Sequence, residues 1–333
     1  MTKKEALSKI NLFYKQEDSV TMKVYRGLHG LDGKFRSPAV TLGNFDGVHL
    51  GHGEIFRRLK KRAGEIGGEA LIFTFDPHPA KVLRPEVSPS IITPLSEKLC
   101  LIEKYGLDGI ILADFNKEFA AQHPASFVKD ILHGKLGAKL VMIGHDFTFG
   151  KGKAGNIDSL ALLGKEAGFS VEVVEAIKLD GEIVSSTRIR ELIKKGKVKE
   201  ASRLLGRHHS IEGKVIKGHG RGKPLGFPTA NIDFHAELLP QYGVYAVKAQ
   251  LGQRQLKGIA NIGIKPTFND DEPSIETHIL DFDESIYGQD LKVSFVDRVR
   301  DVRSFNDPQD LSDQIAKDIG QARQMLDGVS IED

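Results

Sequence analysis

Residues 43–53, GNFDGVHLGHG, decide how the first half of this chain folds. They follow a short apolar run, AVTLG at 39–43, and lead into HGEIFRRLKKRAGEIG at 52–67, where apolar residues recur at helical spacing. A helix that begins directly after a glycine-rich turn offers unpaired N–H groups and the positive end of its dipole. The motif therefore lies where a phosphate group is expected to bind.

Outward from this motif, short apolar runs alternate with helical segments such as NIDSLALLGKEAGF at 156–169. The expected strands are AVTLG (39–43), EALIFTF (69–75), GIILA (109–113), KLVMIG (139–144) and SVEVVEA (170–176). Nearly continuous apolar strands are typical of a parallel sheet that is buried on both faces. We predict a Rossmann-like α/β domain over residues 22–186.

The hydrophobic pattern of the sequence changes after a basic segment with helical periodicity at 187–206, which we interpret as a linker. Short runs that partly alternate in polarity follow, separated by Gly, Pro, Asn and Asp: HSIEGKVIKG (209–218), YGVYAVKAQL (242–251), RQLKGIANIG (254–263), SIETHILDF (274–282) and LKVSFVDRV (291–299). This pattern predicts an antiparallel β-barrel over residues 207–330. The last expected element is a helix at 308–326, whose apolar stripe can pack on the barrel.

The length and composition predict a two-domain globular protein, and we expect it in the cytoplasm. The chain has 333 residues, of which 40% are hydrophobic and 28% charged, and a formal net charge of +2. A net charge this small produces only a weak long-range electrostatic field, so we expect no nucleic-acid or membrane partner. The single cysteine, Cys100, cannot form an intramolecular disulfide, and we see no apolar run of about 18 residues and no apolar leader in MTKKEALSKI.

Two histidines give the first motif its chemistry. His49 and His52 are three residues apart, so both can lie on one face of the first helical turn and stabilise charge on a transferring phosphate. A plain turn with two exposed histidines is one alternative. Half of a zinc site is another, which we disfavour because such a site needs three or four ligands.

The motif resembles the H-x-G-H signature of nucleotidyltransferases. Three further strings, each following an expected strand, extend the resemblance: FTFDPHP at 73–79, GHDFTFG at 144–150 and VSSTRIR at 184–190. In this order they resemble the adenylyltransferase half of the prokaryotic bifunctional riboflavin kinase/FAD synthetases. The family resemblance extends over nearly the whole chain.

This resemblance implies roles for residues of the first half. His49 and His52 would hold the phosphates of ATP and act in catalysis, and further contacts to ATP would come from Gly43, Phe45, Asp46, Gly47, Gly51, Ser186, Thr187 and Arg188. The flavin would be contacted by Asp76, Pro77, His78, Asp146 and Phe147, although Asp76 and His78 could equally be buried hydrogen-bond partners. The phosphate of FMN would be the nucleophile, so the enzyme would supply positioning and charge neutralisation, with Mg²⁺ on the leaving pyrophosphate.

A second motif, KGHGRGKPLGFPTAN at 217–231, begins where the first barrel strand should end. Gly218, Gly220 and Gly222 alternate with His219, Arg221 and Lys223, which predicts a loop that wraps a phosphate or, alternatively, a flexible basic loop. Thr229 and Asn231 are two residues apart, so in an extended stretch both can bind one cation through oxygen. They could also be turn residues.

LGFPTAN resembles the riboflavin kinase signature, and so do NIGIKPTF at 261–268 and IETHILDFD at 275–283. The resemblance implies that Thr229 and Asn231 hold the magnesium of MgATP and that Glu276 is the general base for the riboflavin 5′-hydroxyl. Arg300 would contact flavin. The chain departs from the family's R-x-E-x-K-F pattern within 299–307, where Val302 and Ser304 replace the expected glutamate and lysine.

The sequence thus predicts two successive reactions: ATP and riboflavin give FMN and ADP, and ATP and FMN give FAD and pyrophosphate. The expected partners of the protein are riboflavin, FMN, ATP and Mg²⁺. One alternative keeps the first half as a nucleotidyltransferase for another phosphate, with a barrel that only binds ligand. Another is a flavin-sensing or nucleic-acid-binding regulator that uses the basic linker, which predicts salt-sensitive binding.

Overall fold

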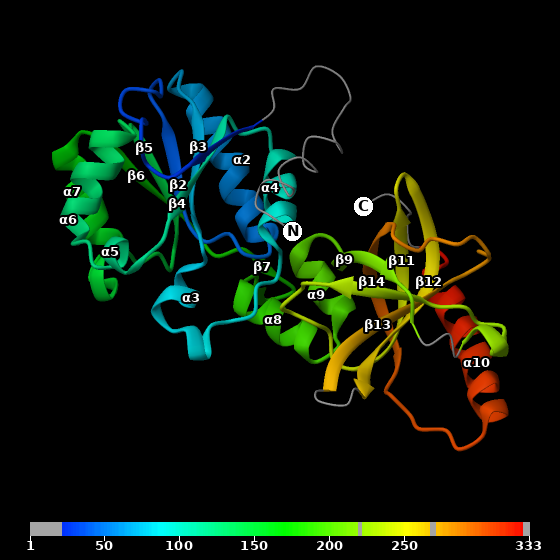
Figure 1. Ribbon diagram of the computed structural model, residues 1–333. Helices are drawn as coiled ribbons and strands as arrows, with labels where there is room; N and C mark the ends of the chain where they lie inside the picture. Colours follow the sequence, from blue (N-terminus) through cyan, green and yellow to red (C-terminus); the bar gives the residue numbers. More distant parts are fainter. Residues whose placement is uncertain (1–21, 219–221, 267–270, 329–333) are drawn as a thin grey trace. The chain divides into compact units, whose positions relative to one another are not determined.

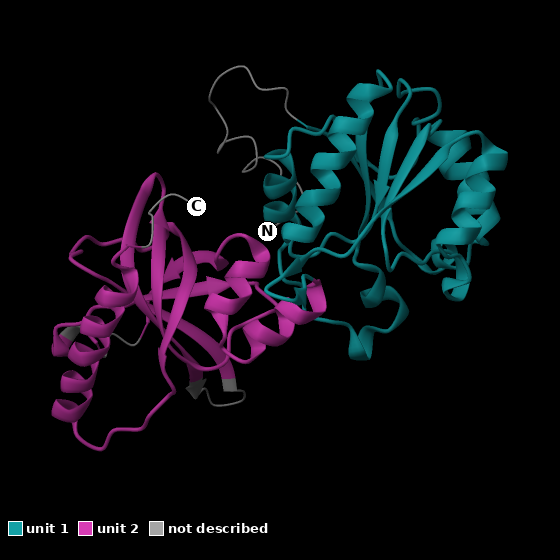
Figure 2. Ribbon diagram, turned by 180° about the vertical axis from the view of Figure 1, so that it is seen from behind, with its two compact units in different colours: residues 1–184 teal, residues 185–333 magenta. Residues whose placement is uncertain are grey.

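The computed structural model describes residues 22–218, 222–266 and 271–328 (Figure 1). The chain separates into two compact units, Met1–Val184 and Ser185–Asp333 (Figure 2). Each unit is described by itself below. This division counts the helices of the expected linker with the second unit.

The first unit is built on a six-stranded parallel sheet with the order β1-β4-β3-β2-β5-β6. Its strands are β1 (Lys23–Arg26), β2 (Ala39–Leu42), β3 (Ala70–Asp76), β4 (Gly109–Asp114), β5 (Leu140–Gly144) and β6 (Ser170–Val174). The helices are α2 (Leu50–Glu65), α3 (Pro79–Leu83), α4 (Leu95–Glu103), α5 (Lys117–Ala120), α6 (Pro124–Ser126), the π-helix η2 (Phe127–Lys135) and α7 (Ile157–Ala167), with 3-10 turns η1 (Pro85–Val87) and η3 (Lys151–Lys153). The predicted α/β fold is confirmed.

Both faces of this sheet are buried, because successive strand residues point to opposite sides. Ile110 of β4 belongs to a cluster with Phe56 of α2, whereas its neighbour Ile111 packs in a second cluster with Leu132 of η2. In Figure 1, α2 and α4 lie along one side of the sheet and α5–α7 along the other. This explains why the strands are almost continuously apolar.

The strand order reverses at β2, which lies between β3 and β5. The chain proceeds from β2 through β3 to β4 in one direction, and then returns to place β5 on the other side of β2. Parallel sheets bind ligands beyond the carboxyl ends of their strands at such a reversal. The motif at 43–53 follows β2 directly, so the topology brings it to this position.

The second unit contains a closed antiparallel barrel with the order β10-β13-β12-β11-β14-β9, as predicted. Its strands are β9 (His209–Ile216), β10 (Ala230–Phe234), β11 (Gly243–Leu251), β12 (Arg254–Pro266), β13 (Asp271–Ile279) and β14 (Asp290–Arg300). Its helices are α8 (Ser186–Lys194), α9 (Val198–Leu205) and α10 (Pro308–Leu326), with a 3-10 turn η4 (Lys223–Leu225). Ala322 and Leu326 of α10 are buried against barrel residues such as Val244 and Ala246, as the apolar stripe predicts.

A short hairpin, β7 (Lys178–Leu179) and β8 (Glu182–Ile183), precedes the boundary between the units. Within the ranges described above, no helix is both long and apolar enough to cross a membrane.

Candidate active sites

The loop after β2 has an unusual backbone. Phe45, Gly47 and Val48 have φ of 50°, 89° and 41°, and a left-handed conformation is rare for a β-branched residue such as valine. Phe45 and Val48 are 3% and 4% exposed, so their burial in the core holds the loop in this shape. Backbone strain of this kind is concentrated at functional sites.

The two histidines lie together at the start of α2. His49 is the N-cap residue of the helix, and its Nδ1 accepts a hydrogen bond of 3.3 Å from the backbone N–H of His52. The two rings stack with centroids 3.5 Å apart, and His49 is only 5% exposed. Because Nδ1 accepts, a neutral His49 ring carries its proton on Nε2. The alternative of two exposed histidines is therefore wrong for His49.

The glycines of the motif permit close packing within the loop itself. A Cβ on Gly51 would lie 3.2 Å from Cε1 of His49, and a Cβ on Gly43 would lie 2.8 Å from Cζ of Phe45. The sequence interpretation assigned these glycines to a close approach of the ligand. The structure adds that they leave room for the His49 and Phe45 side chains.

Asp46 has a structural partner that the motif did not reveal. Its carboxylate is 4% exposed and accepts hydrogen bonds from the backbone N–H groups of Ile92, at 3.1 Å, and Thr93, at 3.2 Å. A carboxylate would also repel a phosphate. The Asp46 carboxylate thus belongs to the frame of the loop, and the ATP contact that the resemblance implies for Asp46 stays a prediction.

The other strand-end motifs of this unit lie at the same edge of the sheet. Asp76 ends β3 and is followed by Pro77 and His78, whereas Asp146 and Phe147 follow β5. His78 is the N-cap residue of α3, and its Nδ1 accepts a hydrogen bond of 3.2 Å from the N–H of Ala80. His78 was expected either to contact the flavin or to be a hydrogen-bond partner within the fold. The structure shows it in a local hydrogen bond, and the flavin contact stays a prediction.

Ser186, Thr187 and Arg188 begin α8, which is counted with the second unit. The N-cap residue is Ser185, whose Oγ accepts a hydrogen bond of 3.3 Å from the N–H of Arg188. The segment thus opens a helix, whose N-terminus is compatible with the predicted anion-binding role.

Lys98 is a buried cation that sequence reasoning missed. It is 7% exposed, and its Nζ donates to the carbonyl oxygen of Asn44 at 3.2 Å and to Oγ1 of Thr74 at 3.4 Å. Burial lowers the pKa of Lys98 to about 8, against the opposing effect of the carboxylates of Asp46 and Asp76. The available signal was a lysine within the apolar stripe of LSEKLCLIE at 95–103.

The candidate site of the second unit lies on three neighbouring strands. Asn231 of β10 is the register partner of Glu276 of β13, which is also paired with Asn261 of β12. Residues directly opposite in an antiparallel pair have Cβ atoms about 4.5–5.5 Å apart. The adjacent residues Ala230 and Ile275 lie in the barrel core, so these three polar side chains emerge on the outer face. Sequence reasoning quoted the segment containing Asn261 without singling it out.

Asn231 is enclosed by the second glycine-rich motif. Its side chain is 4% exposed, and a Cβ on Gly218 would lie 2.1 Å from its Nδ2. Its Oδ1 is buried and has no hydrogen-bond partner within the described structure. Thr229 directly precedes β10 and is half-buried. A bound cation would supply the missing partner of the Asn231 oxygen.

Part of this loop lies outside the described residues. The predicted phosphate ligands Gly220 and Arg221 belong to that part, and for Lys223 only the backbone is described. Gly222 is described: a Cβ there would lie 2.3 Å from the carbonyl oxygen of Phe227. That position therefore requires glycine for packing against the following turn.

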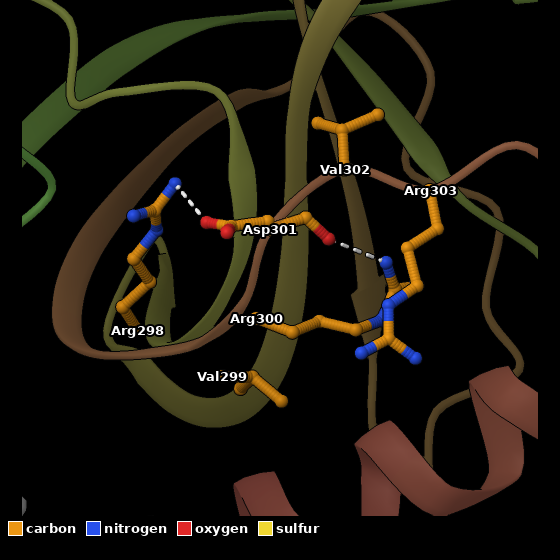
Figure 3. A pocket seen from close by; sticks show the side chains of 6 residues that line it. All are labelled: Arg298, Val299, Arg300, Asp301, Val302 and Arg303. Carbon is orange, nitrogen blue, oxygen red and sulfur yellow. Dashed lines mark hydrogen bonds and ion pairs between the residues drawn. The ribbon is translucent and has the colours of Figure 1, made fainter.

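Arg300 lines a hollow of about 550 Å³ together with Arg298, Val299, Asp301, Val302 and Arg303 (Figure 3). Its Nε donates to the two carboxylate oxygens of Asp318 on α10, at 3.0 and 2.8 Å, and Asp318 is 1% exposed. Its Nη1 donates to the carbonyl oxygen of Asp301 at 2.8 Å. The guanidinium of Arg300 thus anchors this segment to α10, and its assignment as a flavin contact stays a prediction.

Removing Asp318 should destabilise the second unit. Loss of one partner of a buried ion pair leaves an uncompensated charge and costs about 3–5 kcal/mol. We expect Asp318→Ala to lower the free energy of unfolding by this amount in denaturant titrations. Asp313→Ala, at an exposed position of the same helix, is the matched control and should change it by less than about 0.5 kcal/mol. Equal stability of the two variants would contradict the anchoring role.

Comparisons with known proteins agree with the division of the chain into two units. Residues 33–188 match the family model of FAD synthetase, and residues 205–326 match that of riboflavin kinase. A bifunctional riboflavin kinase/FMN adenylyltransferase of Haemophilus influenzae is 37% identical over 91% of this chain and 98% of its own length. The corresponding protein of Bacillus subtilis is 38% identical over 84% of this chain and 89% of its own.

A solved structure also matches. It is titled a macrolide-efflux protein from Streptococcus pneumoniae, has 30% sequence identity and a TM-score of 0.83, and the match covers 91% of this chain and 99% of that one.

Proposed function

The chain belongs to the family of bifunctional riboflavin kinase/FMN adenylyltransferases, and we propose that its barrel carries the kinase site and its parallel-sheet unit the adenylyltransferase site. It uses ATP to phosphorylate riboflavin to FMN and then to adenylylate FMN to FAD. The observation that carries the assignment within the barrel is the paired position of Asn231 and Glu276 on β10 and β13. We also propose the cytoplasm as its location, from the single cysteine and the composition.

In the kinase reaction, Glu276 is proposed to accept the proton of the riboflavin 5′-hydroxyl. The hydroxyl oxygen then forms a bond to the γ-phosphorus of ATP, the bond from that phosphorus to the bridging oxygen breaks, and ADP leaves. Glu276 is half-buried on the outer barrel face beside Asn231, so a base and a cation ligand would flank the same substrate.

Magnesium fits the Asn231 position. Within residues 22–218, 222–266 and 271–328, no group of three or more His, Cys, Asp or Glu could hold a metal. The buried, unpaired Oδ1 of Asn231 is instead a neutral oxygen ligand, and Thr229 would add a hydroxyl. Oxygen ligands from protein and from ATP phosphates are typical of Mg²⁺, which neutralises phosphate charge when it is bound.

In the adenylyl reaction, a phosphate oxygen of FMN is proposed to attack the α-phosphorus of ATP while the bond to the pyrophosphate breaks. The chain then has to orient two anions and stabilise the added charge. The stacked His49 and His52 at the N-terminus of α2 are the groups we assign to this task, because imidazole N–H donors and the helix dipole both favour anions. No side-chain nucleophile is required.

Asn231→Ala tests the magnesium assignment. Removing a ligand should raise the Mg²⁺ concentration for half-maximal riboflavin phosphorylation by at least roughly tenfold, while adenylylation of added FMN stays unchanged. Asp233→Asn, at an exposed position two residues along β10, is the control. An unchanged Mg²⁺ dependence in Asn231→Ala would show that Asn231 is not a ligand.

A further inference from the structure

We propose that Lys98 is a positioning residue for adenylyl transfer, which fixes the loop at 43–53 against the end of β3 and compensates the carboxylates gathered there. The inference rests on the proposed assignment of adenylyl transfer to the first unit. Neither the sequence motifs nor the family resemblance pointed to this residue.

The geometry joins three elements at one ammonium group. Lys98 lies on the buried side of α4 beside Leu99 and Ile102, and its Nζ donates to the carbonyl oxygen of Asn44 and to Oγ1 of Thr74. The Thr74 hydroxyl also donates to the carbonyl oxygen of Asn44, at 3.2 Å. One polar cluster therefore connects the loop at 43–53, the carboxyl-terminal part of β3 and α4.

The same loop is tied a second time to the chain segment before α4. Asp46 accepts hydrogen bonds from the backbone of Ile92 and Thr93, six and five residues before Lys98. One continuous segment thus holds the loop twice, through the backbone N–H groups of Ile92 and Thr93 and through the ammonium group of Lys98. Only a few residues separate these contacts from His49, which caps α2.

The charge of Lys98 has a role that packing alone does not explain. A buried ammonium is costly compared with an apolar side chain of similar length, so a purely structural position would favour the apolar side chain. The charged groups that act on Lys98 are the carboxylates of Asp46, from the loop, and Asp76, at the end of β3. Without the ammonium, the negative charge of both carboxylates would be uncompensated near the edge where we place two anionic substrates, and would disfavour their binding.

This charge balance depends on pH. Burial lowers the pKa of Lys98 to about 8, although Asp46 and Asp76 oppose the shift. Lys98 is charged below this pH and loses its proton as the pH rises through it. The net charge of the three groups then changes from −1 to −2, so binding of ATP and FMN should weaken above about pH 8.

The test compares Lys98→Met and Lys98→Arg with the wild-type chain. We would measure kcat and KM for adenylylation of added FMN between pH 6 and 9.5, with riboflavin phosphorylation as an internal control of folding. In Lys98→Met, KM for ATP and FMN should rise about tenfold or more at pH 7, and the change near pH 8 should disappear. Arginine stays charged over the whole pH range measured, so in Lys98→Arg the KM for ATP and FMN should not rise near pH 8. Lys104→Met, at an exposed position after α4, should behave as wild type.

Two outcomes would overturn the inference. One is a Lys98→Met variant with the kinetics and pH profile of the wild type. The other is a Lys98→Arg variant whose KM rises near pH 8 as in the wild type, a result that stands even if Lys98→Met does not fold. Absence of FMN adenylylation in the wild-type chain would instead refute the proposed function.

Discussion

A Glu276→Gln variant is expected to phosphorylate riboflavin roughly 10²- to 10⁴-fold more slowly than the wild type, because a general base contributes a factor of this size. Glutamine keeps the shape of the side chain but cannot accept the hydroxyl proton. The loss should appear in kcat, since Glu276 acts on the reacting proton. The measurement is initial FMN formation from riboflavin and ATP.

The same variant should adenylylate added FMN at the wild-type rate, because Glu276 belongs to the barrel of the second unit. Glu272→Gln provides a matched control, since Glu272 is an exposed carboxylate on the same strand, β13. It should leave both reactions unchanged. A Glu276→Gln variant with normal FMN formation would refute the assignment of the base.

A His49→Asn variant is expected to lose roughly 10²- to 10³-fold in the rate of FAD formation from FMN, the effect of removing one preorganised donor to a developing charge. Asparagine is chosen because His49 also caps α2. Asparagine is among the best N-cap residues, whereas alanine would cost about 0.5–2 kcal/mol of stability. The substitution therefore removes the imidazole and retains a cap.

The control for this variant is His133→Asn, at an exposed position in η2. Riboflavin phosphorylation should be unchanged in both variants, because that reaction is assigned to the other unit. If His49→Asn formed FAD normally while His49→Ala did not, the histidine would serve the helix alone.

Much of the fold could be predicted because burial dictates the sequence pattern. The interior strands of the sheet are apolar at consecutive positions, since helices cover both faces. β1 was missed: it is an edge strand of four residues, KVYR, with little burial to mark it. β10 was also missed, because its residues form part of a string that was interpreted for its ligands.

The proximity of two candidate residues could be predicted where both lie within one short string. His49 and His52 come together because three residues make nearly one helical turn. The structural partners of Asp46 and Arg300 were not foreseen, because Ile92 with Thr93 and Asp318 come from other segments. Lys98 was missed for the same reason: its contacts to Asn44 and Thr74 exist only in the folded chain.

The central claim, that each unit performs one of two successive reactions, is tested most directly by a time course with riboflavin, ATP and Mg²⁺. Riboflavin, FMN and FAD are resolved by chromatography for the wild type, His49→Asn and Glu276→Gln. We expect FMN and then FAD from the wild type, accumulated FMN from His49→Asn, and almost no product from Glu276→Gln unless FMN is added. Loss of both reactions in either folded variant, or no flavin product from the wild type, would contradict the account.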